Sequence, residues 1–262
     1  MSNWFEYSKA VVRKIPSSLP KAGLRLEEPS EAINLAKARE QWLNYVQALK
    51  DLKLEIVEIP AEEEFPDCVF IEDVAVVCDQ TALITRPGHI TRRGETTAVR
   101  KALEKLSLQI VDMVEPATLD GGDVLFTGRE FFVGLSSRTN EAGVESLKKA
   151  FPRYPVSAVN VAEGLHLKSM MSMVGPNLIA IGESSAAVSA WKEMEKNGNY
   201  HDYNKVTVSE DKAANCLYIN GVLVYSGRSL NLGALNCRKI KVDCAELAKV
   251  DGCLTCCSLL VK

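Results

Sequence analysis

Two adjacent thiols, Cys256 and Cys257, lie near the end of a 262-residue chain. Residues 253–262 have the apolar character of a strand, so we expect these two side chains to point to opposite faces, one packed and one presented. An unperturbed cysteine has a pKa of about 8.5 and needs a base or a cationic neighbour to become a nucleophilic thiolate. A reactive cysteine here would therefore need an activating group from elsewhere in the chain.

A histidine and a carboxylate that could activate a thiol occur far upstream. His166 lies between two leucines, where a lone histidine is more often a satisfied core residue. Asp120 opens the run Asp120-Gly121-Gly122-Asp123, which alone could equally be a solvated turn. A carboxylate can hold a histidine in the tautomer that accepts a thiol proton, so the three residue types together can act as a triad. We therefore predict Cys256, His166 and Asp120 as the catalytic set.

Further carboxylates indicate a cationic ligand. Asp67, Glu72 and Asp73 belong to one segment, and the last two lie inside an otherwise apolar run. Buried carboxylates are costly unless they are paired, and the planar donors of a guanidinium match them bidentately. In the opposite sense, Arg92 and Arg138 could hold a carboxylate, although either one alone is more simply a solvated surface residue.

The elements that must bring these residues together follow a repeated order of hairpin, helix and strand. Four such units are predicted, with a short helical stretch after the hairpin of the last one: residues 68–113, 124–161, 165–209 and 216–242. The first part of the chain predicts strands at 11–15 and 54–59 and a helix over 29–52, opened by Ser30. If the leftover strand 254–261 pairs with 11–15, a fifth unit is completed and the array closes into a ring. The starts of the hairpins, including Asp67 and the catalytic set, would then meet near a pseudo-fivefold axis.

The composition is that of an ordinary globular protein, with 47% hydrophobic and 25% charged residues. We expect one domain spanning residues 1–262. A net charge of −3 provides no basic surface for nucleic acid or anionic lipid. No signal peptide and no membrane-length apolar run are present, so a cytoplasmic protein is expected, with its eight cysteines reduced. The spacing of cysteines and histidines shows no structural zinc pattern, and we predict no metal.

Several runs resemble the dimethylarginine dimethylaminohydrolase family. The resemblance covers nearly the whole chain and rests on residues 67–77, 83–88, 118–140, 164–169 and 254–258. It implies a five-bladed α/β-propeller of ββαβ modules. It also implies hydrolysis of asymmetric dimethyl-L-arginine and monomethyl-L-arginine to L-citrulline and dimethylamine or methylamine, without a cofactor. Such an activity would link the chain to nitric oxide metabolism.

The resemblance assigns a role to each matched residue. It makes Cys256 the nucleophile, His166 the general acid and base, and Asp120 the third catalytic member. The other matched residues fall at substrate-binding or site-ordering positions (Asp67, Glu72, Asp73), at positions that bind the amino-acid carboxylate (Arg92, Arg138), on a flexible lid (Leu24) and at a main-chain contact (Val250). The chain departs from the family by a shortening between residues 219 and 250, and at Cys253, where the members compared carry an apolar residue.

The predicted reaction proceeds through a covalent S-alkylthiouronium on Cys256. The expected partner is a small molecule, methylated arginine, bound by a monomer. Two alternatives remain open from the sequence: an arginine deiminase or another amidino-group enzyme with the same catalytic set, and a non-catalytic, thiol-regulated homologue.

Overall fold

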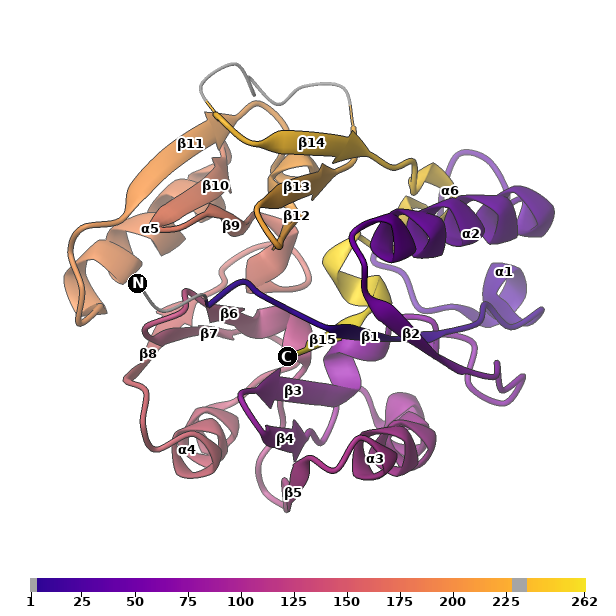
Figure 1. The fold of residues 1–262 in the computed structure, drawn as a ribbon, viewed down its shortest axis with the longest axis horizontal. Helices are drawn as coiled ribbons and strands as arrows, with labels where there is room; N and C mark the ends of the chain where they lie inside the picture. Colours follow the sequence, from indigo (N-terminus) through magenta and orange to yellow (C-terminus); the bar gives the residue numbers. More distant parts are fainter. Residues whose placement is uncertain (1–3, 228–234) are drawn as a thin grey trace.

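Five three-stranded sheets are grouped around a common centre in the computed structural model, which describes residues 4–227 and 235–262 (Figure 1). In each sheet the middle strand pairs antiparallel to one neighbour and parallel to the other, and in four of the sheets the antiparallel pair is a hairpin. The mixed α/β architecture and the number of sheets agree with the five predicted modules, and the arrangement fits pseudo-fivefold symmetry.

Four of the sheets are formed by consecutive segments of the chain. Their strands are β3 (Ala75–Cys78), β4 (Thr81–Ile84) and β5 (Gln109–Asp112); β6 (Val124–Phe126), β7 (Phe131–Leu135) and β8 (Val156–Asn160); β9 (Met171–Gly175), β10 (Leu178–Gly182) and β11 (Asn204–Val208); and β12 (Cys216–Ile219), β13 (Val222–Tyr225) and β14 (Arg238–Lys241). The helical stretch predicted after the fourth hairpin includes residues 228–234, which lie outside the described residues.

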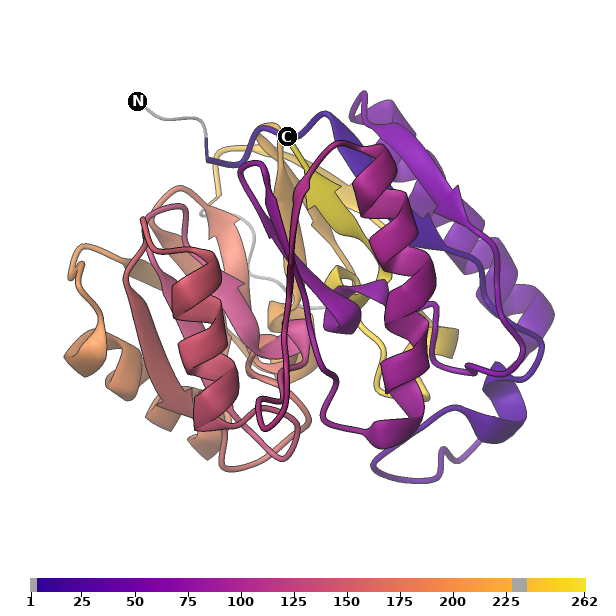
Figure 2. The same ribbon diagram turned by 90° about the horizontal axis from the view of Figure 1, so that it is seen from below.

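The fifth sheet joins the two ends of the chain. Strand β1 (Lys9–Arg13) lies between β2 (Glu55–Ile59), to which it is parallel, and β15 (Leu259–Val261), to which it is antiparallel, with Ala10 opposite Leu260. In Figure 2, the indigo start of the described chain and the C-terminus lie on the same side of the molecule. The predicted pairing between the N-terminal and C-terminal strands is confirmed.

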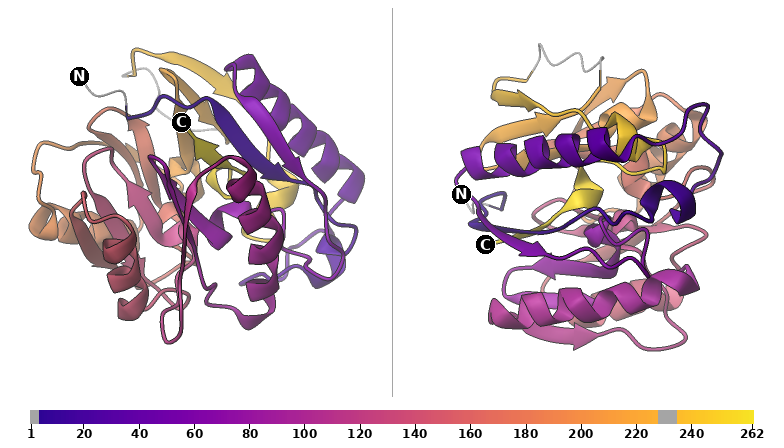
Figure 3. Two further views of the ribbon diagram at one scale, coloured as in Figure 1. Left: turned by 60° about the horizontal axis from the view of Figure 1, so that its bottom comes forward. Right: turned by 90° about the vertical axis from the view of Figure 1, so that its right-hand side faces the viewer.

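The longer helices lie on the outside of the sheets, as Figures 1 and 3 show for α2 and α3. They are α2 (Leu35–Asp51), α3 (Thr96–Lys105), α4 (Glu141–Ala150) and α5 (Ser185–Asn197); two short helices are α1 (Leu19–Ala22) and α6 (Ala245–Ala248). The prediction that Ser30 opens the first long helix is wrong. That helix begins after Asn34, whose extended backbone and side-chain bond to the Lys37 amide form the N-terminal cap. None of the described helices combines the length and apolar character needed to cross a bilayer.

Hydrophobic clusters connect each sheet to its neighbours. The cluster around Phe131 contains residues of both β4 and β7, and the cluster around Trp191 contains residues of β7 and β10. A third cluster connects β10 to β13, and a fourth connects β13 to β1 and α2. The fifth connects β1 and β15 to β4, so that the succession of clusters returns to its starting sheet. Burial of apolar surface thus holds each sheet against two others.

In every sheet, a 3₁₀ turn precedes the strand that pairs antiparallel to the middle strand. These turns are η1 (Ile71–Val74), η3 (Gly121–Asp123), η4 (Leu167–Ser169), η5 (Asp211–Ala214) and η7 (Thr255–Cys257); a further 3₁₀ segment, η2 (Ile90–Glu95), leads into α3. The sequence prediction had extended the hairpin strands through several of these turns, and this was wrong. Side chains in a 3₁₀ turn do not alternate between two faces as they do in a strand. Such a turn can therefore direct several polar side chains toward the common centre of the five sheets.

Candidate active site

One small pocket brings together nine of the ten predicted site residues. The pocket has a volume of about 40 Å³, and its lining includes Leu24, Asp67, Asp73, Arg92, Asp120, Arg138, His166, Val250 and Cys256. The tenth residue, Glu72, lies outside this lining. Residues separated by more than two hundred positions in the sequence therefore face the same space.

The 3₁₀ turns explain how distant modules contribute to this pocket. Asp120 and His166 occupy the positions directly before η3 and η4, and Asp73 and Cys256 lie within η1 and η7. Four sheets thus each present a polar side chain from the turn that leads into their first strand.

The prediction that Cys256 and Cys257 alternate across a strand is wrong, because both belong to η7 and the strand β15 begins only at Leu259. The two thiols nevertheless have different surroundings. Cys256 is half-buried and lines the pocket, whereas Cys257 is buried in the hydrophobic cluster that contains α2. The turn separates the two environments in the way that the sequence analysis had attributed to a strand.

Two carboxylates lie on opposite sides of the His166 ring. Its Nε2 atom is 3.0 Å from Asp120 Oδ2, and its Nδ1 atom is 4.0 Å from Asp73 Oδ1. Burial alone lowers the pKa of an imidazole, but the negative charge of Asp73 and Asp120, together with that of Asp123, outweighs burial and raises the pKa of His166 to about 9. At neutral pH, His166 is therefore an imidazolium that can donate a proton.

The double glycine after Asp120 is required by close packing. A Cβ atom on Gly121 would overlap the carbonyl oxygen of Glu72, and one on Gly122 would lie 2.5 Å from Nδ1 of His166. Gly122 also donates its backbone N–H to Asp73 at 3.0 Å. These glycines allow η1, η3 and the histidine to approach one another, and the run is a part of the site and not a solvated turn.

Asp123, the second carboxylate of that run, orders the neighbouring turn. It is fully buried and accepts hydrogen bonds from the hydroxyls of Ser136 and Thr139 and from the backbone N–H of Leu167. Burial raises its pKa to about 6, although these donors and His166 act in the opposite direction. Because Leu167 follows His166, Asp123 fixes the backbone that carries the histidine.

The two predicted carboxylate-binding arginines differ in their partners. Arg92 is buried and forms ion pairs with Asp73 (2.5 Å) and Glu95 (2.8 Å), and it donates a further bond to the carbonyl of Phe70. Among the described residues, no carboxylate forms an ion pair with the half-buried Arg138. Arg92 therefore holds the carboxylates of the site in place, whereas Arg138 lines the pocket without such a partner among the described residues.

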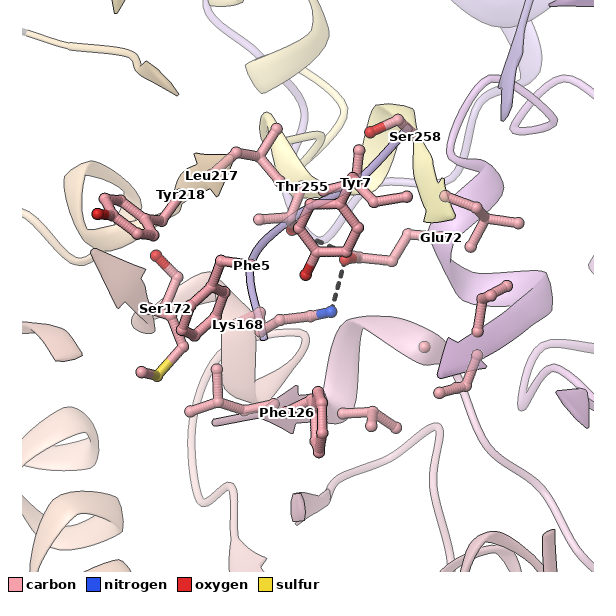
Figure 4. A pocket seen from close by; sticks show the side chains of 18 of the residues that line it. Phe5, Tyr7, Glu72, Phe126, Lys168, Ser172, Leu217, Tyr218, Thr255 and Ser258 are labelled. Carbon is pink, nitrogen blue, oxygen red and sulfur yellow. Dashed lines mark hydrogen bonds and ion pairs between the residues drawn. The ribbon is translucent and has the colours of Figure 1, made fainter. Parts of the chain in front are cut away.

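Glu72 belongs to a buried polar network, shown in Figure 4. Its carboxylate pairs with Lys168 at 2.5 Å and accepts a hydrogen bond from Thr255 at 2.8 Å. Asn215 in turn donates to the Thr255 hydroxyl and to the carbonyl of Lys168. Glu72, Lys168 and Thr255 line a second cavity of about 160 Å³, together with Phe5 and Tyr7. The geometry gives Glu72 a site-ordering position.

A segment near the N-terminus, residues 24–26, also lines the pocket. Leu24 donates its backbone N–H to the Asp67 carboxylate at 3.0 Å, and Leu26 donates its own to Asp251 at 2.7 Å. Val250, which precedes Asp251, is buried and lines the same pocket. The predicted lid residue and the predicted main-chain contact thus both line the pocket.

Asp73, Asp120 and His166 could each supply one ligand atom to a metal ion, because one polar atom of each lies within 4.8 Å of the other two. A metal-binding histidine must be neutral, and the raised pKa of His166 opposes this. Asp73 is also already paired with Arg92. The chemistry of the donor set fits a proton-transfer site better than a metal site.

Several ordering residues were not identified from the sequence. These residues make the contacts described above: Glu95, Lys168, Thr255 and Asn215. Only the pairing of Glu95 with Arg92 could have been predicted from the sequence, because Glu95 follows Arg92 by three residues on one turn of helix. The partners of Lys168 and Thr255 come from other modules, and no local pattern indicates such contacts.

The fold and the pocket define a class: mixed α/β proteins of five sheets whose modules meet at a Cys, His and carboxylate site. Residues 24–229 match the family described as "N,N dimethylarginine dimethylhydrolase, eukaryotic". The chain belongs to the dimethylarginine dimethylaminohydrolase family.

Individual relatives agree with this placement. A protein of Streptomyces coelicolor named N(G),N(G)-dimethylarginine dimethylaminohydrolase is 35% identical, over 97% of each chain. A Bos taurus relative, named as a hydrolase (DDAH2) without a substrate, is 44% identical over 81% of this chain and 74% of its own. The solved structure of the Pseudomonas aeruginosa enzyme, a cysteine-to-serine mutant with citrulline bound, has a TM-score of 0.88 and 28% identity over 98% of this chain and 100% of that one.

Proposed function

We propose that this chain is a cysteine-dependent hydrolase that converts asymmetric dimethylarginine and monomethylarginine to citrulline and a methylamine. The observation that carries the proposal is the meeting of Cys256, His166 and Asp120, from three modules, in one small pocket lined by further carboxylates. Membership of the family and the citrulline-bound structure of a relative support it. We also propose that residues 1–262 form one catalytic domain whose sheets close into a five-bladed propeller, supported by the cyclic succession of hydrophobic clusters.

Substrate binding is expected to use both charges of the pocket. The carboxylates of Asp67 and Asp73 attract a guanidinium, and the guanidinium of Arg138 attracts the amino-acid carboxylate at the other end. Arg92 would act on the substrate mainly through Asp73, which it holds in place. Leu24 would close over the bound ligand as a lid residue, and Val250 would contact the ligand through its main chain; both line the pocket.

In the first half of the reaction, the Cys256 sulfur attacks the guanidinium carbon. The hydrogen bond to Cys253 and burial raise the pKa of Cys256, and the bound cation would lower it by favouring the thiolate. A carbon–sulfur bond forms, and the carbon–nitrogen bond to the methylated nitrogen breaks as the His166 imidazolium gives that nitrogen a proton. A methylamine leaves, and an S-alkylthiouronium remains on Cys256.

In the second half, His166 is neutral and can act as a base. It accepts a proton from a water molecule, whose oxygen attacks the same carbon. The carbon–sulfur bond then breaks, and citrulline is released as the second proton of the water passes to solution, where the departed amine takes it up. The Cys256 thiolate is restored and His166 is again an imidazolium. Asp120 stabilises the charged ring through the 3.0 Å contact to Nε2 throughout the cycle.

Product analysis with three substrates tests this function. We expect citrulline from dimethylarginine and monomethylarginine, with one equivalent of the corresponding amine, and much less citrulline from arginine. Citrulline and ammonia from arginine at the higher rate would instead identify an arginine deiminase. No citrulline from any of the three, with a folded protein, would contradict an enzymatic role on these substrates.

The cellular setting follows as a further part of the proposal. All eight cysteines are free thiols, which fits the reducing cytoplasm. We propose a cytoplasmic monomer that needs no cofactor, connected to nitric oxide metabolism through its methylated substrates. Sedimentation of the purified protein checks the oligomeric state.

A further inference from the structure

One sheet provides no side chain to the catalytic pocket. Each of the other four provides one from its 3₁₀ turn, whereas none of the described residues from η5 to β14 lines this pocket. Asn215 ends the turn η5 and directly precedes β12, and only 2% of its surface is exposed. A buried amide needs hydrogen-bond partners, because leaving it unpaired is costly. The partners of Asn215 lie in the two turns beside Cys256 and His166.

The side chain of Asn215 makes three hydrogen bonds. Its Oδ1 atom accepts from the backbone N–H of Thr255 at 3.0 Å. Its Nδ2 atom donates to the Thr255 hydroxyl at 3.0 Å and to the carbonyl of Lys168 at 2.8 Å. An amide side chain has one carbonyl oxygen and two N–H donors, so all of its polar groups are used. Because Thr255 directly precedes Cys256 and Lys168 follows His166 by two residues, one side chain joins the two turns.

The bond to the Thr255 N–H acts as an N-terminal cap of η7. The first N–H groups of a helical turn have no partner within the turn, and a polar residue directly before it usually accepts from them. In η7 that place is taken by Leu254, which makes no capping bond and is buried in a hydrophobic cluster. Asn215, 40 positions earlier in the chain, supplies the acceptor. The start of the turn that carries Cys256 is therefore fixed by another module.

The backbone of Asn215 is itself held on both sides. The hydroxyl of Ser172 donates to the carbonyl of Ala214 at 2.6 Å and accepts from the N–H of Cys216 at 2.8 Å. Ser172 is buried and belongs to β9, the strand that follows the turn η4 and His166. Asn215 is thus anchored on the histidine module and reaches from there to the turn of the nucleophile.

This arrangement bears on the reaction more than on the binding of substrate. Within the described part of the chain, Asn215 forms no hydrogen bond with Asp67, Asp73 or Arg138, which are the groups proposed to hold the two ends of the ligand. Thr255 continues the network to Glu72, as Figure 4 shows, and not into the catalytic pocket. Loss of the amide would therefore shift the Cys256 turn relative to His166 and leave the binding groups in place.

We propose that Asn215 is a positioning residue that sets the placement of the Cys256 sulfur relative to the His166 ring. This role rests on the proposed function and deepens it, whereas the cap of η7 does not depend on it. Reaction rates are sensitive to such placement, and a displacement of about 1 Å can cost on the order of a hundredfold. Asn215→Ala should accordingly lower kcat by that order and change KM little.

Hydrogen exchange of single amides, followed by NMR on the full chain, tests the cap without any substrate. In Asn215→Ala, the Thr255 N–H should exchange roughly tenfold faster or more than in the wild type, since the loss of an ordinary hydrogen bond corresponds to about that factor. Asn215→Ser, whose short hydroxyl leaves room for a water molecule, repeats the measurement if the alanine variant unfolds.

Asn220 offers a matched control in the same sheet. It lies on the turn between β12 and β13, outside the lining of the catalytic pocket, and its side chain also makes three bonds: it accepts from the N–H of Tyr7 and donates to the carbonyls of Tyr7 and Leu52. Its φ of 51° is left-handed, so glycine can replace it without backbone strain. Asn220→Gly should leave both the Thr255 exchange rate and kcat close to those of the wild type.

Kinetics with dimethylarginine on the same three proteins completes the test. Unchanged exchange of the Thr255 N–H in Asn215→Ala would overturn the cap. A fall in kcat no larger than that of Asn220→Gly, or a rise in KM with kcat preserved, would overturn the positioning role. Faster exchange in Asn215→Ala together with a wild type that forms no citrulline would contradict the proposed function and leave the cap standing.

Discussion

The protonation of His166 makes the stability of the protein depend on pH in a defined direction. Burial lowers the pKa of this imidazole, yet the surrounding carboxylates raise it from 6.5 to about 9. Each unit by which the pKa in the folded state exceeds that in the unfolded state adds about 1.4 kcal/mol to the free energy of unfolding. Protonation of His166 therefore stabilises the folded state by about 3 kcal/mol. Because the folded-state pKa is the higher one, this stabilisation is complete below pH 6.5 and is lost as the pH rises through about 9.

Urea unfolding at a series of pH values measures this contribution. The free energy of unfolding of the wild type should fall by about 3 kcal/mol between pH 6.5 and the range above pH 9, beyond the fall shown by His166→Gln, whose side chain stays neutral. The chain has only three histidines, so NMR titration of the imidazoles gives an independent check. One ring should titrate near pH 9, and that of His89, whose pKa is lowered by burial and by Arg138, should titrate below 6.5. If no ring titrates above pH 7.5 or so, the reasoning about the paired carboxylates is refuted.

Three further substitutions test separate parts of the site. Arg138→Ala should lower kcat/KM for dimethylarginine by roughly tenfold or more, since a charged hydrogen bond contributes about 1.5–3 kcal/mol. Inhibition by a small alkylguanidine, which lacks the amino-acid carboxylate, should change little. Equal losses for both ligands would rule out a carboxylate contact. Asp120→Asn should lower the pKa of His166 toward its ordinary value, and an unchanged NMR titration would contradict the 3.0 Å contact. Lys168→Met should destabilise the fold by about 3–5 kcal/mol because it leaves Glu72 buried without a cation; the double variant with Glu72→Gln should recover part of that loss in urea unfolding.

Hydrophobic periodicity and turn residues were sufficient to predict the five modules. The hairpin strands at 124–126 and 131–135, and those at 216–219 and 222–225, have the predicted bounds. Their alternating apolar residues and short turns are local signals. The pairing of the two terminal strands was also predictable, because one incomplete unit and one leftover strand remained.

The 3₁₀ turns before the hairpins could not be read in the same way. Cys256 and Cys257 show why: a run of apolar residues fits a strand and a buried turn equally well, and only contacts with other modules decide between them. The separation of one reactive and one packed thiol was right, and its proposed structural cause was wrong. The contacts of Arg92 were equally hidden, because three of its partners lie in the segment 67–73, which follows a different backbone course from the one predicted.

The most direct test of the central claim is the yield of citrulline from dimethylarginine in Cys256→Ala and Cys257→Ala, measured together with dimethylamine. Wild type and Cys257→Ala should release both products in equal amounts, because the second thiol is packed away from the pocket. Cys256→Ala should release neither, although its folding and its binding of dimethylarginine persist. Turnover by Cys256→Ala at a rate comparable to that of the wild type would contradict the assignment of this residue as the nucleophile.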